Sequence, residues 1–372
     1  MNKTKVLHLS KEYTGNQLFR NSFILGLDPE RYDVKTCYIS GKPDGRNVLD
    51  QHGKSIYLGI DDLRKSKLRA LLSLRKVLRK ERPEILHCHR HRAAVCGVLA
   101  SLFLRDAKIV LHVHGTNRTR TLGRKIKIWL LSKKISRIIC VSEGVRDDVI
   151  RRYWGISEKQ VVAIPNGLDY ERFIINRPKG EARKTISDGL EDKFLIGVVG
   201  RLVQKKNHMR LIEAFQKVIN VNPGIYLIIV GEGPLKNSLM EKVNSLKIGK
   251  NVIFTGFRSD VPLILNALDA FVLPSLPGEG LPLALLEAMG SGLPVIASKI
   301  PGIIEIFNET NMGYLIDPLN IQEMAEKILD ISKLSGPELR EMGLNAQKRA
   351  FSDYNSELMV KKISSLYETL TR

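Results

Sequence analysis

Two segments of the chain combine residue types that suit the binding of a phosphorylated ligand. The first is an apolar stretch, 194–199, which ends in a glycine and is followed by Arg201 and Lys206. A glycine between a strand and a helix exposes backbone N–H groups that bind phosphate, and the two cations add positive charge there. Taken alone, the segment also fits basic residues in a solvated loop, so its interpretation depends on the second segment.

The second segment holds two carboxylates eight residues apart among apolar residues and glycines. Glu279 precedes a helical pattern and Glu287 lies within it. Carboxylates accept charge-assisted hydrogen bonds from hydroxyl groups, such as those on the sugar and ribose rings of a nucleotide sugar. The backbone N–H groups of Gly280 and Leu281 are expected to bind a phosphate at the start of the helix. The alternative is one acid at a helix N-terminus and one paired, buried acid.

The elements that position these residues alternate between short apolar runs and helical patterns, which predicts parallel sheets with helices on both faces. Residues 174–193 are polar and lack an apolar period, and they are expected to link two domains, 1–173 and 194–354. A helix at 355–372 is expected to pack back onto the first domain. The expected strands are 5–10, 32–39, 55–58, 85–89, 108–114, 137–142, 161–165, 194–200, 225–231, 252–256, 270–274, 294–298 and 314–317.

Charge is distributed unevenly along the 372 residues. The net charge is +20, and residues 1–172 carry 35 Lys and Arg against 17 Asp and Glu. This excess predicts an anionic partner for the first domain. In the basic segment 118–134, Ile126, Trp129 and Leu130 lie among the cations, as in helices that bind an anionic membrane surface. The alternative is a solvated helix face, while the low aromatic content of 6% argues against nucleic acid.

A metal centre and a membrane span are not expected. Three histidines alternate along one strand pattern, His87, His89 and His91, but Arg90 and Arg92 would repel a cation. The chain also has no D-x-D pair to hold a metal on a diphosphate. The four cysteines include no C-x-x-C pair and are expected to be reduced and buried. There is no apolar run of roughly 20 residues, and no signal peptide is expected at the N-terminus.

Taken in order along the chain, these segments resemble retaining glycosyltransferase family 4. The resemblance rests on the cations and the carboxylate pair above, together with the segments 141–145, 164–173, 230–234, 254–257 and 301–305. It implies the GT-B fold, in which two Rossmann-like domains face each other across a cleft. It also implies transfer of a sugar from a nucleotide sugar with retention of anomeric configuration.

The resemblance assigns roles to residues by matching position. Arg201 and Lys206 would neutralise the donor diphosphate, Glu279 would contact the transferred sugar, and Glu287 would bind the ribose. In the first domain, the matching positions are a glycine in the loop after the first strand, Gly15, and a histidine near the reacting sugar, His114. The family commonly has a Gly-Gly pair where this chain has the single Gly15, and His112 is the alternative to His114.

The resulting expectation is a hexosyltransferase that requires no metal or other cofactor. It would move a sugar from a nucleotide-diphosphate sugar to a glycan or lipid-linked acceptor, in cell-surface polysaccharide assembly, in the cytoplasm at the inner face of the membrane. The alternatives are a nucleotide-sugar epimerase of the same fold and a non-catalytic anion-binding protein. A nicotinamide-dependent oxidoreductase is disfavoured because the closest segment, 231–234, lacks the third glycine of G-x-G-x-x-G.

Overall fold

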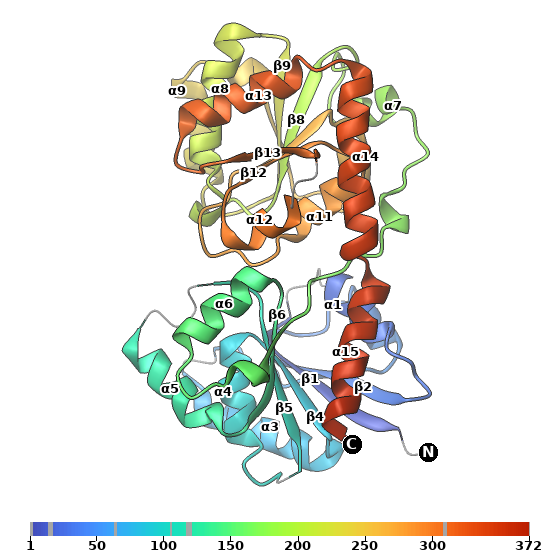
Figure 1. Cartoon of the computed structure of the whole chain (residues 1–372), viewed down its shortest axis with the longest axis vertical. Helices are drawn as coiled ribbons and strands as arrows, with labels where there is room; N and C mark the ends of the chain where they lie inside the picture. Colours follow the sequence, from blue (N-terminus) through green and yellow to red (C-terminus); the bar gives the residue numbers. More distant parts are fainter. Residues whose placement is uncertain are drawn as a thin grey trace. The chain divides into compact units, whose positions relative to one another are not determined.

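The computed structural model describes residues 3–13, 18–62, 65–104, 106–116, 121–307 and 311–371. The chain forms two compact units (Figure 1). Unit 1 contains Met1–Gly167 and Ser356–Arg372, and unit 2 contains Leu168–Asn355. Each unit is built on a parallel sheet with flanking helices, so the predicted fold class of two α/β units is confirmed.

Within its described residues, unit 1 holds a seven-stranded parallel sheet in the order β3-β2-β1-β4-β5-β6-β7. The chain adds β2 and β3 on one side of β1 and then places β4 on the other, so the order reverses between β1 and β4. The strands are β1 (Thr4–Glu12), β2 (Tyr32–Ser40), β3 (Ser55–Tyr57), β4 (Ile85–His89), β5 (Lys108–Val113), β6 (Ile135–Cys140) and β7 (Val161–Ala163). The helices are α1 (Leu18–Leu25), α2 (Val48–Gln51), α3 (Lys67–Glu81), α4 (Arg90–Ala100), α5 (Leu122–Ser132), α6 (Glu143–Arg152) and α15 (Ser356–Thr371).

The last helix, α15, completes the core of unit 1. Its buried face carries Met359, Ile363 and Tyr367, which pack against Val6 of β1 and Val110 of β5. Figure 1 shows α15 lying along the sheet of this unit. These buried positions follow the helical period of about four residues, which is why the sequence pattern predicted the helix.

Unit 2 repeats the design, with a six-stranded parallel sheet among its described residues in the order β10-β9-β8-β11-β12-β13. Here the order reverses between β8 and β11. The strands are β8 (Phe194–Val199), β9 (Ile225–Val230), β10 (Val252–Gly256), β11 (Ala270–Leu273), β12 (Val295–Ser298) and β13 (Gly313–Ile316). The helices are α7 (Lys179–Lys184), α8 (His208–Val221), α9 (Lys236–Ser245), α10 (Val261–Ala267), α11 (Leu283–Gly290), α12 (Pro301–Phe307), α13 (Ile321–Ser332) and α14 (Gly336–Asp353).

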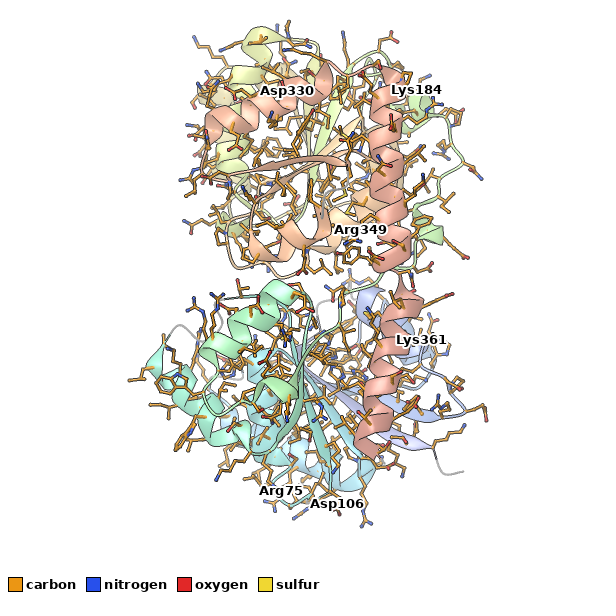
Figure 2. All side chains as sticks on the ribbon, viewed as in Figure 1. Arg75, Asp106, Lys184, Asp330, Arg349 and Lys361 are labelled. Atoms are coloured by element: carbon orange, nitrogen blue, oxygen red, sulfur yellow. The ribbon has the colours of Figure 1, made fainter. Side chains whose placement is uncertain are left out.

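Apolar strands and amphipathic helices build the core of unit 2. Ile229 of β9 is fully buried together with Phe215 of α8 and Ile328 of α13. Burying a side chain of this size contributes about 1.5–3 kcal/mol relative to leaving it in water. Arg349 of α14, which is labelled in Figure 2, donates to the carbonyl groups of Glu305 and Ile306 and so ties α14 to α12.

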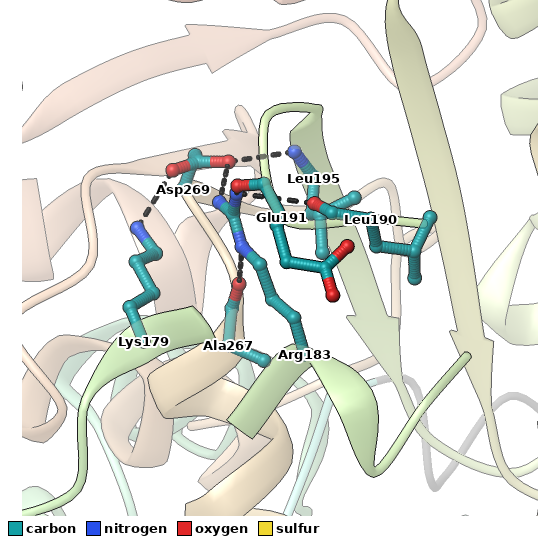
Figure 3. A network of polar contacts seen from close by, with 7 residues as sticks. All are labelled: Lys179, Arg183, Leu190, Glu191, Leu195, Ala267 and Asp269. Carbon is teal, nitrogen blue, oxygen red and sulfur yellow. Dashed lines mark hydrogen bonds and ion pairs between the residues drawn. The ribbon is translucent and has the colours of Figure 1, made fainter. Parts of the chain in front are cut away.

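Residues 174–193, expected to form a linker, instead pack within unit 2. Arg183 of α7 is only 5% exposed and donates to a carboxylate oxygen of Asp269 at 2.6 Å (Figure 3). It also donates to the carbonyl groups of Leu190, Glu191 and Ala267. The segment is anchored by a buried charged network rather than by an apolar stripe, and this is why its polar composition was misleading. The boundary between the units lies after Gly167.

Two further features match the composition. The four cysteines are unpaired, and Cys37, Cys88 and Cys140 are buried while Cys96 is half-buried. Among the described helices, none combines the length and apolar composition that a membrane span requires.

Candidate functional site

The first candidate site lies at the carboxyl edge of the unit 2 sheet, where the strand order reverses. In open α/β sheets, ligands bind outside the carboxyl ends of the strands at this point. The loops that leave β8 and β11 meet there, because the N–H group of Leu276 donates to the carbonyl group of Lys205 at 2.8 Å. Each of these loops carries residues that the sequence singled out.

The two loops are joined by an ion pair between Lys206 and Glu279. The Lys206 Nζ lies 3.0 Å from one carboxylate oxygen of Glu279 and 3.1 Å from the other. The side chains are 18% and 10% exposed, respectively. A 3₁₀ turn, Gln204–Lys206, and the left-handed conformation of Asn207 (φ +60°) aim the lysine toward this edge. The pair is therefore a fixed, largely desolvated charge arrangement at the position expected for a ligand.

Glu287 belongs to the same group of charges. It lies on α11, and burial raises the pKa of its carboxyl to about 7, while Arg172 and Lys206 act in the opposite direction. Lys206 thus pairs with Glu279 and also lowers the pKa of Glu287, so both predicted carboxylates interact electrostatically with this cation. Lys206, Glu279, Glu287 and Arg172 are called the lysine–carboxylate cluster below.

Arg172 is the member of this cluster that the sequence did not identify as a site residue. It is exposed and follows Glu171 in the short turn Glu171–Phe173. The segment is held in unit 2 by Tyr170, which is stacked on Phe351 with ring centroids 4.9 Å apart. The available signal was its place at the end of segment 164–173, which the resemblance had already included.

Gly280 and Leu281 lie before α11 rather than in its first turn. The helix begins at Leu283, and both residues are buried in the preceding loop. Gly302 at the start of α12 packs on this loop so closely that a Cβ atom there would lie 1.5 Å from the carbonyl oxygen of Gly280. The two residues therefore lie in a loop that close backbone packing fixes just before the helix, and the binding of phosphate by their N–H groups stays a prediction.

Arg201 is separated from β8 by Gly200 and is exposed, unlike Lys206. The loop that carries it is shaped by the neighbouring loop after β9. The N–H group of Leu202 donates to the carbonyl group of Glu232 at 3.0 Å, and a Cβ atom at Gly231 would lie 2.0 Å from the carbonyl oxygen of Gly200. Glycine is required at 231 because the two backbones meet there.

The second candidate site is a group of imidazoles on one face of the unit 1 sheet, near its carboxyl edge. It is called the histidine cluster and contains residues from β1, β4 and β5 and the end of β5: His8, His87, His89, His112 and His114. Alternate positions along each strand place these rings on the same face. The rings of His112 and His114 are stacked, with centroids 4.3 Å apart.

The structure separates the two histidines that the sequence left as alternatives. His112 is 2% exposed and its Nδ1 lies 3.1 Å from the Nε2 of His87. His114 is half-buried and follows the last residue of β5. The more accessible ring is therefore that of His114, the preferred residue.

Two further predictions from the sequence concern unit 1. His91 does not continue the strand face of His87 and His89, because β4 ends at His89 and Arg90 adopts a left-handed conformation (φ +69°) at the start of α4. Gly15 lies outside the described residues, so its predicted role stays a prediction.

Comparisons with known proteins agree with this architecture. Residues 182–349 match the family described as glycosyl transferases group 1, and residues 25–172 match glycosyltransferase family 4. The chain is 31% identical over 309 residues to the Escherichia coli UDP-Gal:alpha-D-GlcNAc-diphosphoundecaprenol alpha-1,3-galactosyltransferase, covering 81% of this chain and 79% of that enzyme. It is 26% identical to the capsular polysaccharide biosynthesis glycosyltransferase CapM of Staphylococcus aureus, with 82% of each chain covered.

Solved structures show the same fold at lower identity. Anabaena Alr3699/HepE in complex with UDP superposes with a TM-score of 0.83 at 20% identity, covering 98% of this chain and 100% of that chain. Sucrose-phosphate synthase from Thermosynechococcus elongatus gives a TM-score of 0.84 at 19% identity, covering 99% of each chain.

Proposed function

Because the chain belongs to the group 1 glycosyl transferases, of the family 4 type, we propose that unit 2 binds a nucleotide-diphosphate sugar as donor and that the enzyme is a retaining hexosyltransferase. Glycosyl transfer in polysaccharide or lipid-linked glycan synthesis follows from the family and its relatives. The observation that carries the donor proposal is the lysine–carboxylate cluster at the point where the strand order reverses. A solved structure of the same fold binds UDP-glucose, which supports this assignment.

The cluster suits a donor because it offers both kinds of group that a nucleotide sugar needs. Lys206 and Arg201 supply the positive charge for a diphosphate, and fixed charges aimed at a leaving group stabilise the charge that develops on it. Glu279 and Glu287 supply carboxylates that accept hydrogen bonds from sugar and ribose hydroxyl groups. Neither role needs a metal, and we propose that the reaction uses none at the diphosphate.

Retention of configuration is part of this proposal. Glu279 is held by both of its oxygens against Lys206, an arrangement that suits binding rather than nucleophilic attack. In front-face displacement, the sugar–phosphate bond breaks as the acceptor oxygen bonds to the sugar, and the leaving phosphate takes the acceptor proton. We propose that His114 contacts the transferred sugar in this reaction. The anomeric configuration of the product, measured by NMR, tests the retention.

A panel of nucleotide sugars tests the donor proposal directly. One nucleotide class is expected to raise the melting temperature and to be hydrolysed slowly without acceptor. Calorimetry with the nucleoside diphosphate alone then separates the carboxylates. Glu287→Ala should weaken its binding, and Glu279→Ala should leave binding intact but abolish transfer. Equal losses of affinity would contradict the separate roles, and no response to any nucleotide sugar would contradict the donor site.

The acceptor is proposed to be lipid-linked and reached at an anionic membrane surface on the cytoplasmic side. The observation that favours this surface is α5, where the large apolar residues Leu122, Trp129 and Leu130 are 62%, 56% and 64% exposed. Cations at 124, 125 and 127 lie among them, while Ile128 is buried and anchors the helix to unit 1. Each cation near an anionic leaflet contributes about 1 kcal/mol to attraction.

The charge of the whole unit supports the same partner. Unit 1 contains 37 Lys and Arg against 17 Asp and Glu, a net charge of +20, whereas unit 2 contains 22 of each and is neutral. The two cations proposed to bind the diphosphate, Lys206 and Arg201, lie in unit 2 and do not account for the excess positive charge of unit 1. A large single-sign field attracts an extended anionic surface.

Sedimentation with vesicles tests the membrane proposal. Vesicles of phosphatidylcholine and phosphatidylglycerol should bind the protein at low salt and release it near 1 M salt, where the screening length falls to about 3 Å. Changing Arg124, Lys125 and Lys127 to Glu should weaken binding. The matched control changes three exposed cations of unit 2, Lys217, Lys250 and Lys348, to Glu and should leave binding nearly unchanged. Equal binding to pure phosphatidylcholine vesicles, or equal losses in both variants, would contradict the proposal.

A further inference from the structure

The histidine cluster contains a group of three imidazoles whose arrangement goes beyond sugar binding. One nitrogen each of His89, His112 and His114 lie within 4.8 Å of one another. We propose that these three residues bind a borderline divalent transition metal, of the class of Zn²⁺, Co²⁺ or Ni²⁺, in unit 1. Its residues lie on β4, on β5 and immediately after β5, and they include His114, which is also proposed above to contact the transferred sugar.

Hydrogen bonding prepares His112 for this role. Its Nδ1 lies 3.1 Å from the Nε2 of His87, and the Nδ1 of His87 lies 2.5 Å from the hydroxyl oxygen of Tyr367. If the hydroxyl oxygen of Tyr367 accepts a hydrogen bond from the Nδ1–H group of His87, the Nε2 of His87 accepts one from the Nδ1–H group of His112. The Nε2 of His112 then keeps its lone pair. Metal-binding histidines are commonly held in this way, with the second nitrogen donating to an outer group that fixes the ring.

The buried position of the His112 Nε2 lone pair indicates a metal-binding role for this ring rather than ordinary core packing. His112 is 2% exposed, and its Nε2 has no hydrogen-bond partner among the described residues. A buried polar atom without a partner costs about 1–3 kcal/mol, which a bound metal would remove.

A second group of three in the same cluster is a poorer candidate. His8, His87 and His89 also bring one nitrogen each within 4.8 Å, but all three are buried. Both nitrogens of His87 are already engaged, by Tyr367 and by His112. The group that includes His114 is not fully buried, because His114 is half-buried. Three imidazoles leave one position of a tetrahedral ion open, as in metal sites that bind water or substrate.

The arginines that argued against a metal in the sequence have exposed side chains. Arg90 and Arg92 are exposed on α4, where water screens their charge. Neutral imidazoles prefer borderline metals over Mg²⁺ or Ca²⁺, which select oxygen ligands. This preference makes the metal class a specific part of the proposal.

Metal titration of the full chain tests it. The protein is stripped with a chelator, which is then removed, and Co²⁺ is added while visible absorbance is followed; Zn²⁺ binding is measured by calorimetry. One ion per chain is expected, with the absorption of a nitrogen- and oxygen-ligated rather than a thiolate-ligated site. Mg²⁺ should not compete. His114→Ala removes a half-buried ligand and should abolish stoichiometric binding, while His52→Ala, an exposed histidine of the same unit, should bind as the wild type does.

Tyr367→Phe tests the outer hydrogen bond separately. Loss of such a partner weakens metal affinity about 10- to 100-fold, and the phenyl ring preserves the packing of α15. Circular dichroism establishes that both variants fold. The proposal is overturned if the wild type binds no Co²⁺ or Zn²⁺ stoichiometrically, or if His52→Ala loses as much affinity as His114→Ala. Unchanged affinity in Tyr367→Phe would remove the hydrogen-bond argument on which the choice of these three ligands rests.

Discussion

The two sheets are built alike but bury polar groups at their carboxyl edges in different ways. Unit 1 buries imidazole rings, and its histidine cluster is linked through His87 to Tyr367. Unit 2 buries charges in pairs, Lys206 with Glu279 at its carboxyl edge and Arg183 with Asp269 at the opposite edge, where β11 begins. The two units also differ in net charge. Unit 1 carries +20, largely on its surface, whereas unit 2 is neutral.

This difference indicates which kind of partner each unit is prepared for. A buried ion pair holds its charges in fixed positions, so a small anion meets a site that needs little reorganisation. An excess of exposed cations has no such geometry and acts over a broad area, which suits a surface. The two proposed partners, a membrane and a nucleotide sugar, are both anionic, and the units would distinguish them by the arrangement of charge rather than by its sign.

The largest effect is expected from breaking a buried pair in unit 2. Arg183→Ala leaves Asp269 with Lys179 and the N–H group of Leu195 as its remaining partners. Removing one partner of a buried pair typically costs about 3–5 kcal/mol of unfolding free energy. Lys184→Ala, an exposed neighbour on α7, is the control and should change stability by less than about 0.5 kcal/mol.

The chain offers a way to assign this loss to one unit. Both tryptophans, Trp129 and Trp154, lie in unit 1, so tryptophan fluorescence follows that unit while circular dichroism follows both. In urea titrations, Arg183→Ala should shift the circular dichroism transition and leave the fluorescence transition in place. An equal shift in both signals would show that the two units unfold together.

The next effect concerns catalysis and distinguishes the paired cation from the exposed one. Lys206→Ala should lower kcat/KM about 100-fold and Arg201→Ala about 10-fold, because a charged hydrogen bond contributes more where water is excluded. Steady-state kinetics with the donor identified above provides the measurement, and melting curves control for folding. Near-normal activity of Lys206→Ala would remove the diphosphate assignment and with it the contrast between the units.

A pH dependence is expected from Glu287, the buried acid of the lysine–carboxylate cluster. Its pKa is raised from 4.5 to about 7, so between these values the folded protein holds a proton that the unfolded chain releases. The free energy of unfolding therefore falls as pH rises through this window, by up to about 3 kcal/mol. Glu287→Gln lacks this group and should gain stability relative to the wild type between pH 4.5 and pH 8. Parallel stability curves for the two proteins would contradict the shift.

The smallest effect is expected from salt. Sodium chloride at 0.5 M screens repulsion among the surface cations of unit 1 and should stabilise that unit by less than about 1 kcal/mol. Neutral unit 2 has no such repulsion to relieve, and it serves as the internal control. Tryptophan fluorescence should therefore show a higher urea midpoint in salt, and the part of the circular dichroism transition that belongs to unit 2 should not. A fall in the fluorescence midpoint would contradict the interpretation of the charge.

The strands could be predicted from the sequence because parallel strands are buried on both faces. Each central strand is a short apolar run, as in Ile225–Val230, and all thirteen expected runs overlap observed strands. Several helices were not predicted, including α6 and α14. Their buried positions are few or small, such as Gly343, Ala346 and Ala350 of α14, and give little apolar signal.

The sequence predicted the site residues that lie close together along the chain. It missed those that only the fold brings together. Glu279 and Glu287 flank the start of one helix, so their spacing was visible. Arg172, which acts on Glu287, lies more than a hundred residues earlier and enters only through the fold. The histidine cluster shows the same limit, since His8 joins His87 through strand pairing between β1 and β4, which no local pattern encodes.

The way α15 completes unit 1 also bears on how the protein is made. In topological terms, unit 2 is inserted into unit 1, because Leu168–Asn355 lies between its two parts. On the ribosome, the sheet of unit 1 emerges first but lacks Met359, Ile363 and Tyr367 until the final helix follows. Unit 2 contains all of its own strands and helices before that point. The basic unit is therefore the last to close its core, although its synthesis begins first.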